Sequence, residues 1–270
     1  QALNFNFNQW QNEKGFKKFA SHFYNQTSFL IDRKIKRNGA NFDLNPFSKN
    51  DDELIGLNTN FRNSLFFNRG KQHHSTTYSF LLNENQNLLS VGSVAAKNQS
   101  HQLQYQHLVK KSWLFNLSGS TTSTESTSEN YPNRNFEIDG YQIEPKIGYL
   151  FSKNASWDIF YEFQQKENQI GAFETLKQTR LGTSFTFNSE KGFSMNGEFS
   201  MYNNSYDGNA LSAVGFQMLE GLQPGKNQTW RLLLQKNLTQ YLDVNINYQG
   251  RNSETSKTIH TGNIQLRAFF

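Results

Sequence analysis

Apolar and polar residues alternate one by one along most of this chain. The last residues show the pattern clearly, since Ile264, Leu266, Ala268 and Phe270 are apolar and the residues between them are polar. Residues 157–163 repeat it with larger side chains. Strict alternation over four or more positions is typical of a β-strand whose two faces meet different surroundings. The pattern therefore predicts an all-β fold in which each strand separates an apolar from a polar environment.

Thirteen segments carry this alternation and are predicted to be strands, at residues 2–10, 16–31, 53–67, 72–84, 98–109, 113–122, 136–151, 157–166, 174–187, 193–202, 227–236, 241–250 and 259–270. The connections are predicted to alternate between short turns and long loops, the long loops being 32–52, 85–97, 123–135, 167–173, 203–226 and 251–258. Three of the four prolines fall in long loops. The fourth, Pro145, predicts a bulge or a strand outside the hydrocarbon band, because proline cannot donate to a sheet ladder.

The composition suits a sheet with one apolar and one wet face. Hydrophobic residues make up 35% of the chain and mean hydropathy is −0.75, yet 15% of residues are aromatic and 25 are Phe. A disordered chain lacks such an aromatic content. No window approaches the roughly 18 consecutive apolar residues of a spanning helix. Helical membrane proteins are thereby excluded, whereas membrane barrels, which have a weaker signal in each strand, are not.

The pattern predicts an antiparallel transmembrane β-barrel of the bacterial outer membrane. A tilted strand needs about 9–11 residues to cross a bilayer, and the lengths of the predicted strands are close to this. Short turns that alternate with long loops are also typical of these barrels. Aromatic residues such as Tyr149, Trp157 and Trp230 lie near strand ends, where an interfacial girdle would place them. A soluble all-β protein with one buried sheet face is the alternative, because alternation alone does not separate the two.

Single-chain bacterial barrels close with an even number of strands. Thirteen predicted strands therefore imply a fourteenth, most simply one upstream of Gln1. The alternatives are a strand missed near 87–97 and a spurious first strand. We expect residues 1–270 to form one barrel domain that is the carboxyl-terminal part of a longer chain.

The alternation assigns each strand residue to one face of the barrel. Charges of both signs are predicted to line the lumen, and the lumen candidates are Arg62, Glu144, Lys146, Asp158, Glu162, Arg180, Glu198, Arg231, Asp243 and Arg267. On the last strand, Ile264, Leu266, Ala268 and Phe270 are predicted to face lipid and to close the barrel. Balanced charges favour mutual pairing, and a filled or plugged interior over an open pore.

Several segments resemble the carboxyl-terminal barrel regions of large outer-membrane proteins from Bacteroidota. These are the stretch from Met218 to Trp230 and the ending from Gly250 to Phe270, with shorter matches at 31–34, 61–70 and 143–149. The resemblance implies location and architecture and attaches no specific activity. The terminal Phe270 also resembles the targeting signal that the barrel-assembly machinery reads, which implies that machinery as a partner during biogenesis.

Few residues have the spacing of a catalytic or metal site. The chain has no Cys, so it has no disulfides, thiolate nucleophiles or Cys-based zinc sites. His73, Ser75 and Asn87 superficially resemble the catalytic set of an outer-membrane phospholipase, but the predicted topology places Asn87 at the opposite end of its strand. No second ligand stands at diagnostic spacing from any histidine. We expect no enzyme activity, no metal and no cofactor.

The basic cluster from Arg33 to Arg37 has no nucleic-acid recognition motif beside it and is predicted to be a solvated loop. No nucleic-acid partner is expected. The sequence instead favours a barrel that anchors an upstream domain or serves as a subunit of a larger envelope complex. Its partners would be outer-membrane lipid or lipopolysaccharide and other envelope proteins. The alternative is a passive or plugged pore.

Overall fold

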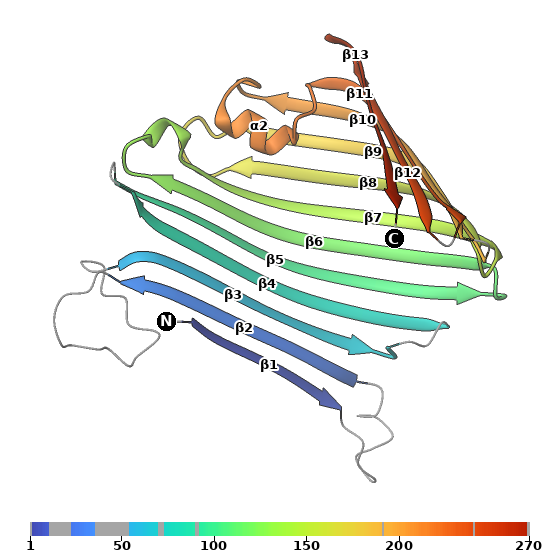
Figure 1. Ribbon diagram of the computed structural model, residues 1–270. Helices are drawn as coiled ribbons and strands as arrows, with labels where there is room; N and C mark the ends of the chain where they lie inside the picture. The colour runs from blue at the N-terminus through green and yellow to red at the C-terminus, as the bar shows by residue number, and fades with distance from the viewer. Residues whose placement is uncertain are drawn as a thin grey trace.

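The computed structural model describes residues 2–10, 23–35, 54–69, 73–89, 92–190, 192–239 and 241–268. They form thirteen strands in one sheet (Figure 1), with bounds β1 Ala2–Trp10, β2 Phe23–Ile35, β3 Leu54–Phe67, β4 His74–Leu89, β5 Gly92–Val109, β6 Trp113–Ser128, β7 Phe136–Ser152, β8 Ala155–Asn168, β9 Thr175–Ser189, β10 Phe193–Asp207, β11 Gly225–Thr239, β12 Leu242–Ser253 and β13 Ser256–Ala268. A 3₁₀ turn, η2 (Pro132–Arg134), precedes β7, and a short helix, α2 (Ala213–Leu219), precedes β11.

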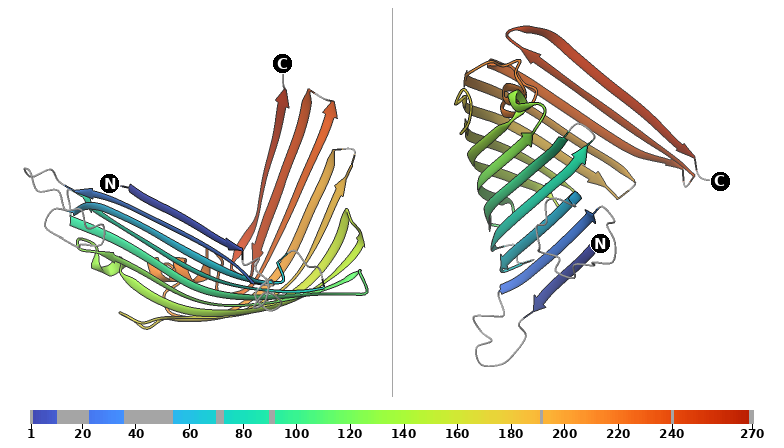
Figure 2. Two further views of the ribbon diagram at one scale, coloured as in Figure 1. Left: turned by 90° about the horizontal axis from the view of Figure 1, so that it is seen from below. Right: turned by 90° about the vertical axis from the view of Figure 1, so that its left-hand side faces the viewer.

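Each strand pairs antiparallel with the next strand in the chain, from β1 to β13. The sheet curls into an open trough with β1 and β13 at its two rims (Figure 2). Among the described residues no pairing joins these two edge strands. Inside a bilayer both edges need a partner strand, because lipid offers backbone groups no hydrogen bonds. The fourteenth strand stays a prediction.

The strands are longer than the sequence predicted. From β4 to β11 they contain 14 to 18 residues. At about 3.3 Å per residue these strands exceed the roughly 25 Å height of a barrel's apolar band. The strict alternation of short and long connections is therefore wrong: only residues 90–91 separate β4 from β5, and only 254–255 separate β12 from β13. Most of the predicted loops 85–97 and 251–258 continue the strands.

Two local predictions are also corrected. Pro145 lies in the middle of β7, and no bulge occurs there. The register between β7 and β8 is the same at Ile143 and at Lys146, and only the two positions between them are unpaired with β8. Arg33 belongs to β2 and is 7% exposed, so this part of the basic cluster is not a solvated loop. Residues 16–22, predicted as the start of the second strand, lie outside the described residues.

The two faces of the sheet differ in the way the alternation predicts. On β8, Trp157, Ile159 and Tyr161 are 45%, 46% and 47% exposed, whereas Phe160 and Glu162 between them are 5% and 6% exposed. We call these two sides the apolar face and the polar face. A soluble sheet buries its apolar side. Here the exposed side is the apolar one, and the charges lie on the concave side, where curvature crowds the side chains together.

Aromatic residues mark one edge of the apolar face. Trp113 and Tyr149 pack edge to face on β6 and β7, with ring centroids 4.9 Å apart, and Trp157 pairs with Tyr149 across β8. These three lie at the turn end of the strands, defined here as the end that carries the 110–112 and 153–154 turns. Such a row is typical of the level at which a bilayer meets water.

The opposite end of the strands, which we call the loop end, carries η2 and α2 (Figure 1). Pro132 starts η2, and Pro224 lies just before β11, so both prolines occupy connections as predicted, while Pro46 lies outside the described residues. Within the part of the chain that the structure describes, no helix is long and apolar enough to cross a membrane.

The connection between β6 and β7 holds a carboxylate that supports a pH-dependent prediction. Glu129 accepts a hydrogen bond from the Ser93 backbone N–H at 2.8 Å, and this bond lowers the pKa of Glu129 from its usual value of 4.5. A carboxyl group with a lowered pKa in the folded state stabilises the fold above its unfolded pKa. That stabilisation is lost as the pH falls from about 4.5 through the folded pKa. We expect Glu129→Gln to flatten the fall in thermal midpoint between about pH 5 and pH 3; an unchanged profile would contradict this.

Candidate functional site

The ten predicted lumen residues all lie on the polar face. The pairing register shows this directly, since Arg62 pairs with Ser28, Glu162 with Arg180, Glu198 with Arg231, and Asp243 with Arg267. On β13, Ile264 and Leu266 lie on the apolar face and are 69% and 66% exposed, and Ala268 shares that face. Phe270 lies outside the described residues. That the polar face lines a lumen and that β13 closes a barrel stay predictions.

Ion pairs connect the polar residues of four neighbouring strands. The Lys146 Nζ atom on β7 lies 3.4 Å from Asp158 Oδ2 on β8. Arg180 on β9 bridges two carboxylates, with Nη1 3.3 Å from Glu162 on β8 and Nη2 2.5 Å from Glu198 on β10. We call Glu162, Arg180 and Glu198 the charge triad. The charge triad joins β8, β9 and β10 on the polar face.

Arg180 is also held by uncharged neighbours. Its Nε donates a hydrogen bond to Ser200 Oγ at 3.1 Å, and Ser200 is fully buried. The guanidinium carbon lies 4.6 Å from the centre of the Phe160 ring, a cation–π distance. Phe160 lies directly over Gly182, where an added Cβ would come within 2.2 Å of the ring. Glycine at 182 therefore makes room for the ring that supports the triad.

Part of the loop between β10 and β11 folds onto the polar face at the loop end. Met218 and Leu219 of α2 are 0% and 1% exposed, and they pack with Val214 against Ile138 of β7 and Leu176 of β9. This contact is the main hydrophobic cluster of the described residues. Since Ile138 and Leu176 both point from the polar face, α2 lies inside the trough and not along its rim (Figures 1 and 2).

Polar contacts fix the two ends of α2. Ser212 caps the amino end by accepting a hydrogen bond from Gly215 N at 2.9 Å. At the carboxyl end, Lys166 of β8 donates to the Met218 carbonyl at 3.2 Å and pairs with Glu220 at 2.5 Å. Lys166 therefore donates to a carbonyl that has no partner within the last helical turn, and it connects the helix to β8.

The rest of the loop is held by buried amides. Asn227, which is 3% exposed, donates to the Gln223 carbonyl at 2.7 Å and accepts from Gln223 N at 3.0 Å. Asn204 donates to the same carbonyl at 2.9 Å. On the other side, Arg251 Nη1 of β12 donates to the Gly221 carbonyl at 3.3 Å. The loop is thus bonded to β8, β10, β11 and β12, so it is a fixed part of the concave side.

A hollow of about 450 Å³ opens on the polar face of β10 to β13, close to this loop. Arg231 and Arg251 line it from adjacent strands, where they are diagonal neighbours in the register. Glu198 also lines the hollow, but its carboxylate is engaged by Arg180. Within the described part of the chain Arg231 makes no ion pair. The hollow therefore presents a net positive wall.

The three residues that superficially resemble a phospholipase set are spread over the length of β4. His73 precedes β4, Ser75 lies near its beginning and Asn87 near its far end, so the three residues do not converge. His101 and His260 each accept or share a hydrogen bond with a tyrosine hydroxyl at 2.8 Å. Among the residues described, no group of three or more His, Cys, Asp or Glu side chains is arranged to hold a metal ion.

Several residues of this site were not predicted from the sequence. Lys166 stands at the end of a predicted strand and was not singled out, while Arg251 and Met218 were assigned to loops. One local signal pointed to α2: a Ser212 cap followed by an apolar segment and Gly221, the usual start and stop of a helix. No signal in the sequence indicated that this helix would pack on the polar face.

No protein-family model matches the chain, and no curated protein matches it in sequence. Solved structures resemble it in fold. The NanC porin is 11% identical, with 100% of this chain and 99% of that chain covered, at a TM-score of 0.43. The ferric yersiniabactin uptake receptor FyuA from Yersinia pestis is 10% identical at a TM-score of 0.51. The match covers 98% of this chain and 52% of FyuA, so this chain spans about half of that receptor.

The likeness to FyuA shows the fold alone, because the identity is 10%. That fold is the outer-membrane β-barrel, and the exposed apolar face is the surface such a barrel turns to lipid. The predictions of fold class and of location in a bacterial outer membrane are confirmed. That the chain has no enzyme activity stays a prediction. The resemblance to Bacteroidota proteins and the barrel-assembly partner stay predictions.

Proposed function

We propose that this outer-membrane barrel is a channel for solutes and that the loop carrying α2 is its constriction. The observation that carries the proposal is the complete burial of Met218 and Leu219 against the polar face. A loop fixed inside the trough narrows any passage along it. A barrel that serves only as an anchor has no need of such a loop. The alternative function predicted from sequence is therefore the one that the geometry favours.

The charges of the wall suggest the kind of solute. Lys146 and Asp158 balance each other across β7 and β8, and the triad leaves one net negative charge across β8, β9 and β10. Arg231 and Arg251 line a hollow whose carboxylate neighbour is already engaged. Rings or rows of unpaired arginine favour anions in a pore. We therefore propose a channel with a preference for small anions and assign no catalytic step to it.

A membrane anchor or envelope-complex subunit is the second candidate, and one observation favours it. Three large apolar side chains at the loop end are strongly exposed: Phe173 is 67%, Phe216 70% and Leu211 92% exposed. They lie beyond the apolar belt, on the β8–β9 connection and on the α2 loop. Exposed apolar groups outside the lipid zone suit contact with another envelope protein.

Single-channel recording of the folded protein in a planar bilayer tests the proposal. We expect stable steps proportional to salt concentration, with chloride favoured over potassium by roughly threefold in a KCl gradient. Arg231→Gln with Arg251→Gln should bring the ratio of chloride to potassium permeability near one. The control is Arg62→Gln, on the polar face of the distant strand β3, which should leave this ratio unchanged. Silence from a barrel shown to be folded by heat-shifted gel mobility would favour the anchor instead.

A further inference from the structure

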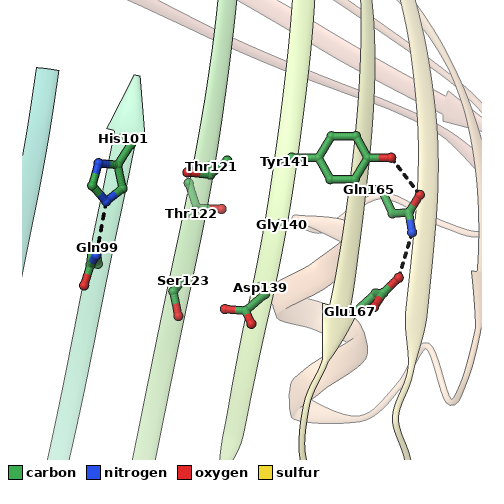
Figure 3. Close-up of a pocket in the computed structure, with 10 residues that line it drawn as sticks. All are labelled: Gln99, His101, Thr121, Thr122, Ser123, Asp139, Gly140, Tyr141, Gln165 and Glu167. Atoms are coloured by element: carbon green, nitrogen blue, oxygen red, sulfur yellow. Dashed lines mark hydrogen bonds between the residues drawn. The ribbon is translucent and has the colours of Figure 1, made fainter. Parts of the chain in front are cut away.

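Two further hollows lie on the apolar face of β5 to β8, on the side opposite α2. The first has a volume of about 420 Å³ and lies toward the loop end, where the side chains of the apolar face become polar. Its lining includes Gln99, His101, Ser123, Asp139, Tyr141 and Glu167 (Figure 3). The register places these residues on the same face as Leu103 and Ile143. We call it the head hollow.

The second hollow has a volume of about 330 Å³ and continues the first toward the apolar belt. The two share His101, Thr121 and Tyr141 in their linings. Its floor is Gly119, which pairs with Leu103 on one side and Ile143 on the other. A Cβ at Gly119 would meet only the Gln142 carbonyl oxygen, at 3.9 Å, so a furrow remains open there. We call it the furrow.

The head hollow contains two carboxylates, those of Asp139 and Glu167, among side chains that can both donate and accept hydrogen bonds. Tyr141 donates to Gln165 Oε1 at 3.0 Å, and the Gln165 amide donates to Glu167 at 2.7 Å (Figure 3). The carboxylate of Asp139 stands on the next strand, opposite Glu167 in the register, and has no hydrogen bond or ion pair within the described residues. No Lys or Arg lines the hollow.

We propose that the head hollow and the furrow bind one membrane lipid with a protonated amine headgroup. The amine lies between Asp139 and Glu167, and an acyl chain lies in the furrow over Gly119. The position fits a lipid because the furrow continues the face that the barrel turns to the bilayer. The charge fits an amine because two carboxylates line the head hollow and neither makes an ion pair within the described residues. Lys177 on the same face of β9 is a diagonal neighbour of Glu167 and is not paired with it. Lipid A phosphates, which are anionic, would be repelled at this place.

Native mass spectrometry of the folded full-length protein tests the proposal without any transport assay, so it stands apart from the channel function. The protein is equilibrated in detergent with equal amounts of phosphatidylethanolamine, phosphatidylcholine, phosphatidylglycerol and lipid A. We expect one phosphatidylethanolamine to be retained in preference to the rest. Phosphatidylcholine is included because its ammonium group is positively charged but has no N–H donor. Comparing it with phosphatidylethanolamine therefore separates the effect of hydrogen bonding from the effect of charge. Equal retention of all lipids, or preferred retention of lipid A, would overturn the proposal.

Variants address the two parts separately. Asp139→Asn with Glu167→Gln should reduce the retained fraction about tenfold. The control is Glu125→Gln with Glu137→Gln, which removes two carboxylates of the same face that lie outside the hollow. This control should leave the retained fraction of lipid unchanged. Gly119→Leu should fill the furrow and also abolish retention. Its matched control is Gly197→Leu on β10, another open glycine of the apolar face, where an added Cβ meets only Leu232 at 3.9 Å. Retention unaffected by Gly119→Leu would show that no chain occupies the furrow.

Discussion

Met218→Asp is expected to release α2 from the polar face and to raise single-channel conductance about twofold, on the view that the loop limits the passage. Met218 is fully buried against Ile138 and Leu176. An ionised carboxylate in that apolar cluster loses its hydration at a cost of several kcal/mol. The cation beside residue 218, Lys166, is already engaged by Glu220 and by the Met218 carbonyl. The strands keep their own hydrogen-bond ladders, so the sheet is expected to fold while the helix detaches. Conductance and protease cleavage within 208–224 are measured on the same preparation.

Phe216→Asp provides the control for this experiment. Phe216 belongs to the same helix but is 70% exposed, so the same charge there leaves the packed face of α2 intact. Its conductance and protease pattern should equal those of the natural protein. If Met218→Asp frees the helix, as seen by cleavage, and the conductance stays unchanged, the loop is not the constriction and the proposed role of α2 is wrong.

Arg180→Met is expected to lower the free energy of unfolding by about 3 kcal/mol, at the low end of values for breaking a buried ion pair because Arg180 is partly exposed. Its side chain is 20% exposed and that of Glu162 is 8% exposed. Removing the guanidinium leaves the Glu162 carboxylate buried without a cation, and Glu198 loses its partner as well. Methionine retains most of the side-chain volume over Phe160. Urea unfolding of the folded protein in detergent, followed by gel mobility, measures the change.

Two further variants separate the charge triad from a general loss of arginine. In a double-mutant cycle, Glu162→Gln should recover much of the loss in the Arg180→Met background, because no unpaired charge then remains buried. Arg62→Met on β3 should change stability by less than about 0.5 kcal/mol, since Arg62 is exposed. A cycle in which the two substitutions are additive would show that Glu162 and Arg180 do not stabilise each other.

The assignment of residues to the two faces was predictable from the sequence. Successive side chains of a strand point to opposite sides, so the order of Trp157 and Asp158 alone separates lipid-facing from polar positions once the segment is a strand. The register places all ten charges on one face, and that this face lines a lumen stays a prediction. Turn residues such as the Lys110–Lys111 pair, both at positive φ, were also recognisable locally.

The lengths of the strands were not predictable in the same way. Segments such as 85–89 and 92–97 resemble a loop in sequence because their apolar residues do not alternate with polar ones, yet they pair residue by residue at the loop end. Backbone hydrogen bonds form the ladder whatever the side chains are, and beyond the bilayer both faces meet water. Alternation therefore reports where a strand crosses lipid, and it does not report where the strand ends.

Sequence by itself determined the all-β class, the two faces and the outer-membrane location, because each follows from a period of two and from the side chains at each position. Tertiary structure alone decided that α2 lies on the polar face, that Arg180 bridges Glu162 and Glu198, and that Gly119 opens a furrow. These contacts join residues from 16 to about 80 positions apart. They depend on sheet curvature and register, which bring distant side chains together and which no local pattern encodes.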